Sequence, residues 1–242
     1  FILNLLITVV LPSIEYTIMS NKNLKIIYMG TPEFAVPSLD KLVENGWNVV
    51  AVITAPDKPK GRGQKLIPSP VKEAALTHEI PVLQPTNLKS PEFLEELKSY
   101  QADLQIVVAF RMLPEVVWSM PPMGTFNLHA SLLPNYRGAA PINWAIINGE
   151  KETGVTTFFL KHEIDTGSII HQEKTPILPE ESLGEVYEKL MNIGSELVVK
   201  TVEDIAKGEV KPLPQDESKA LHHAPKIFKE TCKIDWENSA ES

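Results

Sequence analysis

The chain has 242 residues, of which 43% are hydrophobic and 22% are charged, and its formal net charge is −8. This length suits one large domain, and the composition excludes a disordered chain, which would hold fewer apolar residues. The negative net charge excludes a protein whose whole surface binds nucleic acid. The single cysteine, Cys232, excludes an internal disulfide and a cysteine-rich zinc site, and it fits a cytoplasmic location.

The first twelve residues form an apolar run, FILNLLITVVLP. One interpretation is a signal peptide or a membrane anchor; the other is an extension that precedes a native start at Met19. The run is too short to span a bilayer and has no basic residues at its start, which favours the extension. We therefore expect residues 1–20 to lie outside the native fold, and we expect no membrane association.

Strand-like and helix-like segments then alternate along the chain. The short, β-branched apolar runs predict buried strands at 25–29, 48–54, 82–83 and 104–109. Helical patterns lie between them, one capped by Thr31 with Pro32 at its first position and Gly46 at its end, and others at 71–78 and 91–100. Residues 55–70 predict a long loop. This rhythm predicts an α/β fold, namely a Rossmann-like, doubly wound, mostly parallel sheet with helices on both faces.

The pattern changes after His129. Two further strands are predicted at 155–160 and 168–174, with a tight polar turn between them. A long amphipathic helix follows at 182–207 and ends at Gly208. The remaining residues are polar and contain prolines. The predicted division is therefore an extension at 1–20, a catalytic domain at 21–208 and an irregular linker at 209–242.

Three polar residues are candidates for catalysis. Asn127 and His129 stand two apart at the end of a predicted strand, so their side chains lie on the same side. Asp165 lies in the turn between the two later strands, which can bring its carboxylate to the imidazole. Spacing alone leaves two alternatives open: Asn127 and His129 can be a structural pair that satisfies backbone groups, and Asp165 can belong to an ordinary turn.

Two longer runs around these residues are informative. The run NLHASLLPNYRGAAPINWAIINGE and the run HEIDTGSII resemble the formyltransferases that use 10-formyltetrahydrofolate. The resemblance covers about residues 25–236. It implies that Asn127, His129 and Asp165 are the catalytic trio, that 10-formyltetrahydrofolate donates the formyl group, and that no metal takes part. The start MGTPEFAVPSL and the loop PDKPKGRGQKLIPSPVK are similar to the branch that formylates initiator methionyl-tRNA in translation initiation.

The resemblance also implies a folate site. Its expected residues come from the loop after the fourth strand, from the SLLP run and from the loop before Asp165: Phe110, Arg111, Met112, Leu113, Ser131, Leu132, Leu133, Pro134 and His162. Many members of the family have a Tyr-Gly pair after the fourth strand. The different residues in this chain change the side chains that would border the pterin ring.

Four basic residues lie within the predicted loop at 55–70, with no acidic residue among them: Lys58, Lys60, Arg62 and Lys65. They can be a solvated loop or a clamp on the acceptor end of a tRNA. The resemblance implies the clamp, with Arg62 at the position that the family uses. The resemblance also implies a C-terminal β-barrel domain, which we expect to be missing from this chain, and we expect no obligate protein partner.

Three other functions compete with this hypothesis. A formyltransferase that acts on a small amine, such as glycinamide ribonucleotide, would not need the basic loop. A dinucleotide-binding domain would carry a G-x-G-x-x-G motif, and Gly30 stands alone. A catalytically inert tRNA-binding module would not need Asn127, His129 and Asp165 together.

Overall fold

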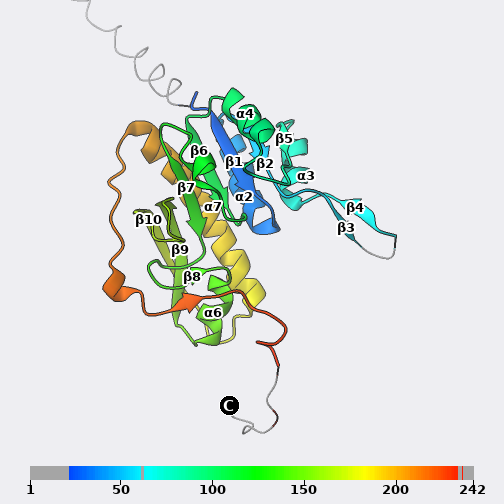
Figure 1. The fold of residues 1–242 in the computed structure, drawn as a ribbon. Coiled ribbons are helices and arrows are strands. Elements are labelled where there is room, and N and C mark those ends of the chain that lie inside the picture. The colour runs from blue at the N-terminus through cyan, green and yellow to red at the C-terminus, as the bar shows by residue number, and fades with distance from the viewer. Residues whose placement is uncertain (1–21, 61–62, 234–235, 237–242) are drawn as a thin grey trace, which may run out of the picture.

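A computed structural model of the protein describes residues 22–60, 63–233 and 236. The expectations for residues 1–20 and for Arg62 fall outside the described residues. The main sheet has seven strands, which run through the middle of the molecule in Figure 1. They are β1 (Ile26–Gly30), β2 (Val49–Ile53), β5 (Val82–Leu83), β6 (Leu104–Val108), β7 (Thr125–His129), β9 (Glu152–Phe159) and β10 (Ile169–Pro176).

The strand order is β10-β9-β7-β6-β1-β2-β5. Within this sheet all pairs among β1, β2, β5, β6 and β7 are parallel. β9 pairs antiparallel with both β7 and β10. The mostly parallel sheet that the sequence predicts is therefore confirmed. Every residue of β1 and β6 is buried, as expected for strands covered on both faces. The strand order reverses between β1 and β6, and such a switch point is where open α/β sheets bind ligands.

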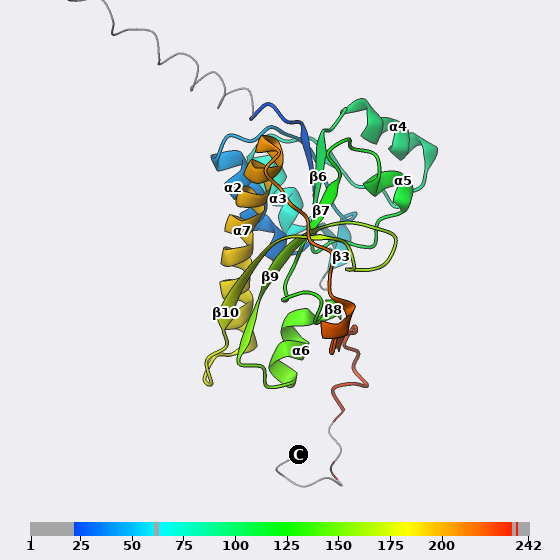
Figure 2. The ribbon, with the colours of Figure 1, turned by 90° about the vertical axis from the view of Figure 1, so that its left-hand side faces the viewer.

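Helices cover both faces of this sheet (Figure 2). The helical segments are η1 (Glu33–Ala35), α2 (Val36–Glu44), α3 (Pro70–Thr77), α4 (Pro91–Ser99), α5 (Glu115–Trp118), α6 (Pro141–Ile147), α7 (Leu183–Lys207) and η2 (Glu217–Lys219). The core on one face includes residues of α2, α3 and α7, and that on the other face includes residues of α4 and α5. Within the described residues, no helix is long and apolar enough to cross a membrane.

Polar caps fix the ends of several helices. Ser69 and Ser90 accept hydrogen bonds from backbone N–H groups at the starts of α3 and α4, and each helix has a proline in its first turn. A capping box of Ser182 and Glu185 begins α7, and Gly208 ends it in the left-handed conformation. The predicted end of this helix at Gly208 is therefore confirmed.

The predicted cap at Thr31 is wrong. The backbone is extended at Pro32, and the chain first makes the short turn η1 before α2 begins at Val36, with no side-chain cap. This turn buries Phe34 and Ala35 directly after β1. Gly30 passes close to this turn, since a Cβ on Gly30 would lie 2.7 Å from the Ala35 Cβ.

Two segments predicted as irregular contain strands. Residues 55–70 include the antiparallel hairpin of β3 (Lys58–Lys60) and β4 (Lys65–Ile67), which projects from the body of the molecule in Figure 1. The segment after α7 includes η2 and β11 (His223–Ala224). β11 pairs in parallel with β8 (Arg137–Gly138), so this segment runs back along the body and docks beside α6. These strands have two or three residues and include Lys, Pro, Arg or His, so they lack the wholly apolar pattern that predicted the equally short strand at 82–83.

Candidate active site

A cavity of about 700 Å³ opens at the carboxyl ends of β1, β6 and β7. Its wall includes Phe34 from the turn after β1, the loop after β6, and the end of β7. This is the place where the reversal of strand order leaves a crevice between the loops. Its volume lies within the range of about 300–1,000 Å³ that is usual for sites that hold a small ligand.

The three candidate catalytic residues all line this cavity. Asn127 and His129 lie at the end of β7, and Asp165 comes from the loop between β9 and β10. The Nδ1 atom of His129 lies 3.9 Å from Oδ2 of Asp165, with side-chain exposures of 7% and 12%. No described residue forms a hydrogen bond with the half-buried side chain of Asn127, so its amide remains available to a ligand.

The imidazole of His129 is oriented by a backbone carbonyl. Its Nε2 atom lies 2.8 Å from the carbonyl oxygen of Tyr136. A carbonyl oxygen only accepts hydrogen bonds, so Nε2 carries a proton and donates it to this contact. Nδ1 is therefore the ring nitrogen that is left for reactants and for Asp165.

Tyr136 is itself held from several sides. Its phenol donates a hydrogen bond of 2.5 Å to Glu150 and accepts one from the amide of Asn148. Burial, together with the Glu150 carboxylate, raises the pKa of the Tyr136 hydroxyl. The Tyr136 ring also stacks on the ring of His222, with centroids 5.4 Å apart. These contacts fix the carbonyl group that orients His129.

The carboxylate of Asp165 is fixed by a backbone donor. The N–H group of Gly138 donates a hydrogen bond of 2.9 Å to Oδ2, the oxygen that faces His129. Gly138 belongs to β8, and its own conformation has a φ of 126°. Sequence reasoning identified neither this donor nor the Tyr136 carbonyl, because main-chain groups leave no residue-specific signal.

Gly138 is predicted to be intolerant of a side chain. An added Cβ would overlap the carbonyl group of Ala224, and the φ angle disfavours L-residues. We expect Gly138→Ala to lower the free energy of unfolding by about 1–3 kcal/mol, measured by urea denaturation. Gly149→Ala is the matched control, because Gly149 also has a positive φ but has open space around it. Equal losses in both variants would contradict the role of the Ala224 contact.

The expected folate residues fall into two groups. Phe110–Leu113 and His162 line the cavity, whereas residues 131–134 do not contribute to its wall. Ser131 instead donates a hydrogen bond to the carbonyl of Asn135, and its own carbonyl accepts one from Thr156. The SLLP run therefore shapes the chain between His129 and Tyr136 and does not face this cavity.

Two polar contacts connect the cavity wall to its surroundings. Arg111 donates hydrogen bonds to the carbonyl groups of Pro85 and Thr86. The Nε2 atom of His162 lies 3.0 Å from a carboxylate oxygen of Glu115, and the His162 ring packs edge-on against Trp118. Since both His162 and Trp118 line the cavity, this pair joins the loop before Asp165 to α5 across the wall.

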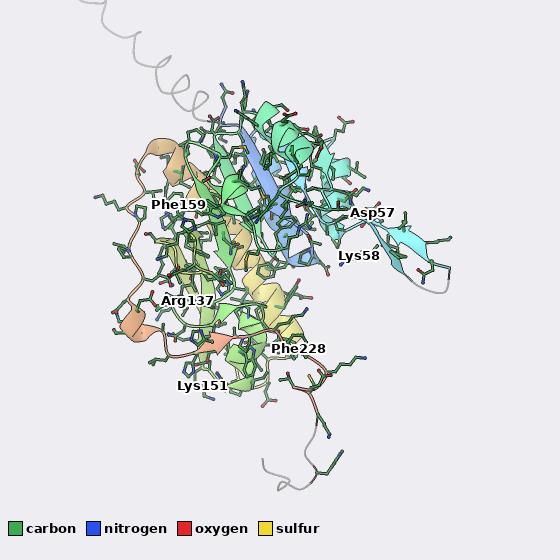
Figure 3. The ribbon with its side chains drawn as sticks, in the orientation of Figure 1. Asp57, Lys58, Arg137, Lys151, Phe159 and Phe228 are labelled. Atoms are coloured by element: carbon green, nitrogen blue, oxygen red, sulfur yellow. The ribbon has the colours of Figure 1, made fainter. Side chains whose placement is uncertain are left out.

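The basic hairpin stands apart from this wall and is anchored at its base. Asp57 lies 2.7 Å from Nζ of Lys72 and accepts a hydrogen bond of the same length from Gln84. These two partners hold the pKa of the Asp57 carboxyl below its usual value. Lys58 and Lys65 are exposed on the two strands of the hairpin. Figure 3 shows Asp57 and Lys58 where the hairpin leaves the body. Arg62 is outside the described residues.

A model of the formyl transferase family matches residues 22–202. The chain belongs to the formyl transferase family. It is 62% identical over 221 residues to a methionyl-tRNA formyltransferase of Bacteroides fragilis, a match that covers 90% of this chain and 68% of the relative. It is 60% identical over 221 residues to the methionyl-tRNA formyltransferase of Bacteroides thetaiotaomicron, covering 90% of this chain and 69% of that protein.

Solved structures of the family share the fold. An N-formyltransferase from Helicobacter canadensis, in complex with folinic acid and dTDP-3-aminofucose, superposes with a TM-score of 0.69 at 25% identity. The match covers 90% of this chain and 77% of the Helicobacter chain. The Rossmann-like fold of this chain is therefore shared with a solved N-formyltransferase.

Proposed function

We propose that this chain transfers the formyl group of 10-formyltetrahydrofolate to the α-amino group of methionyl-tRNA in translation initiation. The observation that carries the proposal is its identity of 60% or more, over about 220 residues, to relatives named methionyl-tRNA formyltransferase. The cavity at the switch point supports it, because Asn127, His129 and Asp165 all line this cavity. In this proposal they are the catalytic residues.

The folate occupies this cavity in the proposal. Phe110 and Leu113 offer apolar surface on one side, and His162 closes another side through its contacts with Glu115 and Trp118. Aromatic and aliphatic surface of this kind suits a flat ring system. The Helicobacter relative binds folinic acid, a formylated folate, which is consistent with a folate site in this family.

Asp165 and His129 suit an amine as the attacking group. An α-amino group has a pKa of about 7.7–8.0, so a useful neutral fraction exists near pH 7. Nδ1 of a neutral His129 and Oδ2 of Asp165 are both acceptors, 3.9 Å apart. An amine placed beside them can donate N–H groups to both. When its nitrogen bonds to the formyl carbon, the amine loses a proton, and Asp165 accepts it directly or through a water.

The Asn127 amide suits the formyl oxygen, which is the group that gains charge in the reaction. The formyl oxygen gains negative charge as the carbon becomes tetrahedral, and the Asn127 amide can donate an N–H group to it. A donor that is aimed at such an oxygen lowers the barrier by about 3–4 kcal/mol. His129, when it is protonated, supplies a second donor through Nδ1. The bond between the formyl carbon and N10 of the folate then breaks, and N10 takes up a proton from Asp165 or from protonated His129. Tetrahydrofolate leaves, and the formylated amine is the second product.

The hairpin is proposed to bind the acceptor end of the tRNA. Lys58 and Lys65 place positive charge on its two exposed strands, and Arg62 and Lys60 add further charge in the sequence between them. The anchor at Asp57 holds the base of the hairpin against α3 and β5. Since Lys and Arg contacts to phosphate release counter-ions, tRNA binding should weaken as salt rises.

Arg62→Ala is expected to affect the two substrates differently. The loss of a phosphate contact should raise KM for methionyl-tRNA about tenfold. It should also reduce the salt dependence of binding, because one positive charge fewer contacts the tRNA phosphates. The affinity for folate should not change, and Lys22→Ala, far along the chain from the hairpin, serves as the matched control for lost charge. An equal loss of affinity for both substrates would count against the hairpin as a tRNA clamp.

The acceptor can be tested directly. The protein is incubated with 10-formyltetrahydrofolate and either methionyl-tRNA or glycinamide ribonucleotide, and the formylated product is detected by mass spectrometry. Folate binding is measured in parallel by fluorescence. Formylation of methionyl-tRNA supports the proposal. Formylation of the small amine alone would contradict the proposed acceptor, and folate binding without transfer to either would contradict the proposed reaction.

A further inference from the structure

The turn that carries Asp165 adopts a conformation that needs support from outside. Asp165 has a φ of 55°, in the left-handed region that costs an L-residue about 1–2 kcal/mol. Two residues later, an added Cβ on Gly167 would overlap the backbone of Phe159, so the chain lies directly against β9 at this point. A turn of this kind keeps its shape only where neighbouring groups hold it.

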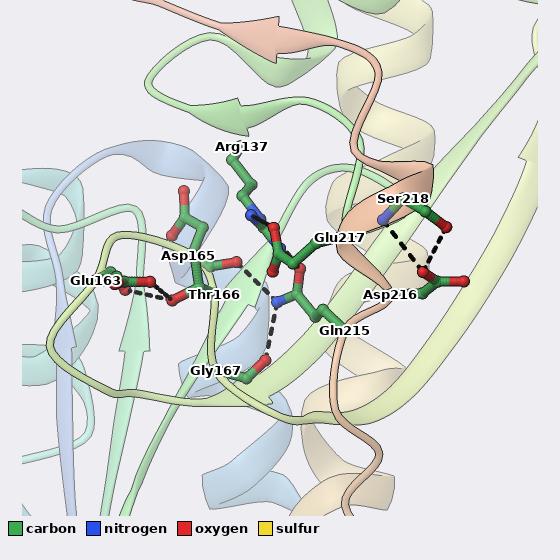
Figure 4. Close-up of polar contacts among 9 residues, drawn as sticks. All are labelled: Arg137, Glu163, Asp165, Thr166, Gly167, Gln215, Asp216, Glu217 and Ser218. Carbon is green, nitrogen blue, oxygen red and sulfur yellow. Dashed lines mark hydrogen bonds and ion pairs between the residues drawn. The ribbon is translucent and has the colours of Figure 1, made fainter.

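One side chain from the segment after α7 bridges this turn. The amide nitrogen of Gln215 donates hydrogen bonds of 2.7 Å to the carbonyl oxygen of Asp165 and 2.8 Å to that of Gly167 (Figure 4). A primary amide has two N–H groups, and both are used here. Gln215 therefore connects the two ends of the turn, 50 and 48 residues away along the chain.

The other end of the same amide is also fixed. Its oxygen accepts hydrogen bonds of 3.1 and 2.6 Å from Nε and Nη2 of Arg137. The guanidinium of Arg137 has a side-chain exposure of 10%, and it also contacts the exposed carboxylate of Glu217. Arg137 precedes Gly138, whose N–H group holds the Asp165 carboxylate. The turn is thus supported at its backbone by Gln215 and at its side chain by Gly138.

Gln215 stands behind the cavity and does not line it. It cannot act on the reactants directly, and its contacts are with the backbone of the turn. We infer that Gln215 is a positioning residue for formyl transfer, which holds the turn at residues 165–167 so that the Asp165 carboxylate stays beside His129. This inference rests on the catalytic role proposed for Asp165.

The first test is Gln215→Ala. Loss of the two donated hydrogen bonds should lower kcat about 10–100-fold, because small displacements of a catalytic group have effects of this order. KM for the folate should stay within about threefold, since that change is less than 1 kcal/mol of binding. Gln215→Glu keeps an acceptor for Arg137 but has no N–H group to donate at neutral pH, so it should lose activity as well. Activity at the wild-type level in both variants overturns the inference.

Glu217→Ala is the matched control. Glu217 lies two residues further along the same segment and pairs with Arg137, but it forms no hydrogen bond with the described residues of the Asp165 turn. Its side chain is 66% exposed, and an ion pair at such a site contributes little to stability. The kcat of Glu217→Ala should therefore stay within about twofold of the wild-type value. A loss equal to that of Gln215→Ala would assign the effect to general loosening of the segment and overturn the inference.

A double-mutant cycle separates positioning from a general structural role. In an Asp165→Ala background, Gln215→Ala should change kcat by less than about twofold, because residues that act through one another are not additive. If the loss of kcat in the double variant equalled the product of the losses in the two single variants, Gln215 would not act through Asp165. That result would overturn the inference.

A readout that needs no turnover distinguishes this inference from the proposed function. Hydrogen exchange of the Gly138 amide, followed by NMR, should become about tenfold faster in Gln215→Ala, because the bond to Asp165 opens more often. The same amide should exchange at the wild-type rate in Glu217→Ala. If the wild-type protein transfers no formyl group, the proposed function fails, and the exchange rates still decide whether Gln215 holds the turn. An unchanged exchange rate of the Gly138 amide in Gln215→Ala would overturn the inference.

Discussion

Replacing Asp165 by asparagine should lower kcat for formyl transfer about 10²–10⁴-fold, the usual contribution of a positioned proton acceptor. The substitution keeps the size of the side chain and an oxygen that can accept the hydrogen bond from Gly138. It removes the carboxylate that lies 3.9 Å from His129, which is the group proposed to receive the proton of the amine. The measurement is single-turnover formylation of methionyl-tRNA.

Asp216→Asn provides the matched control for this loss. Asp216 is an exposed residue that follows Gln215 in the sequence, and it caps η2 by accepting hydrogen bonds from Ser218 (Figure 4). The same change of charge there should leave kcat within about twofold, since an exposed charge contributes little. Wild-type turnover in Asp165→Asn, with the protein folded, would exclude Asp165 as the proton acceptor.

Asn127→Ala is expected to have the second large effect. Removal of the amide should lower kcat about 10²–10³-fold, as for other donors that face a developing oxyanion. No described residue uses this amide in a hydrogen bond, so the folded protein loses little when it is removed. The free energy of unfolding and the affinity for folate should therefore stay near their wild-type values while kcat falls.

The control for this variant is Asn87→Ala, in the loop between β5 and α4, which does not line the cavity. It should keep full activity. A loss in Asn127→Ala that appeared only in KM for the folate would identify Asn127 as a binding residue. That result would remove it from the catalytic trio.

Much of the framework was predictable because it repeats a simple pattern. Continuous β-branched runs such as those at β1 and β6 are typical of strands buried on both faces, and the alternation with helices predicts a parallel sheet. The same-side placement of Asn127 and His129 follows from the period of a strand. The position of Asp165 in the turn between the two later strands allowed it to reach His129, but spacing left an ordinary turn as an alternative. The family resemblance favoured the contact.

The supports of the site were not predictable in the same way. Tyr136 and Gly138 act through main-chain groups, and Gln215 lies in a polar segment with no periodic pattern. The hairpin at residues 58–67 was missed because each of its strands has three residues and Pro59 interrupts the first. Side-chain contacts between distant segments depend on how the segment after α7 docks, which no local pattern describes.

The docking of that segment sets an order of events during synthesis. Asn135 accepts hydrogen bonds from the N–H groups of Leu221 and His222, which are 86 and 87 residues further along the chain. Contacts of such long sequence separation form late, because a large loop must close first. A nascent chain that carries the whole sheet but ends before Gln215 contains Asn127 and His129. It lacks the hydrogen bonds by which Gln215 holds the turn that carries Asp165. The arrangement proposed for catalysis is therefore expected to be completed only after the segment after α7 has left the ribosome.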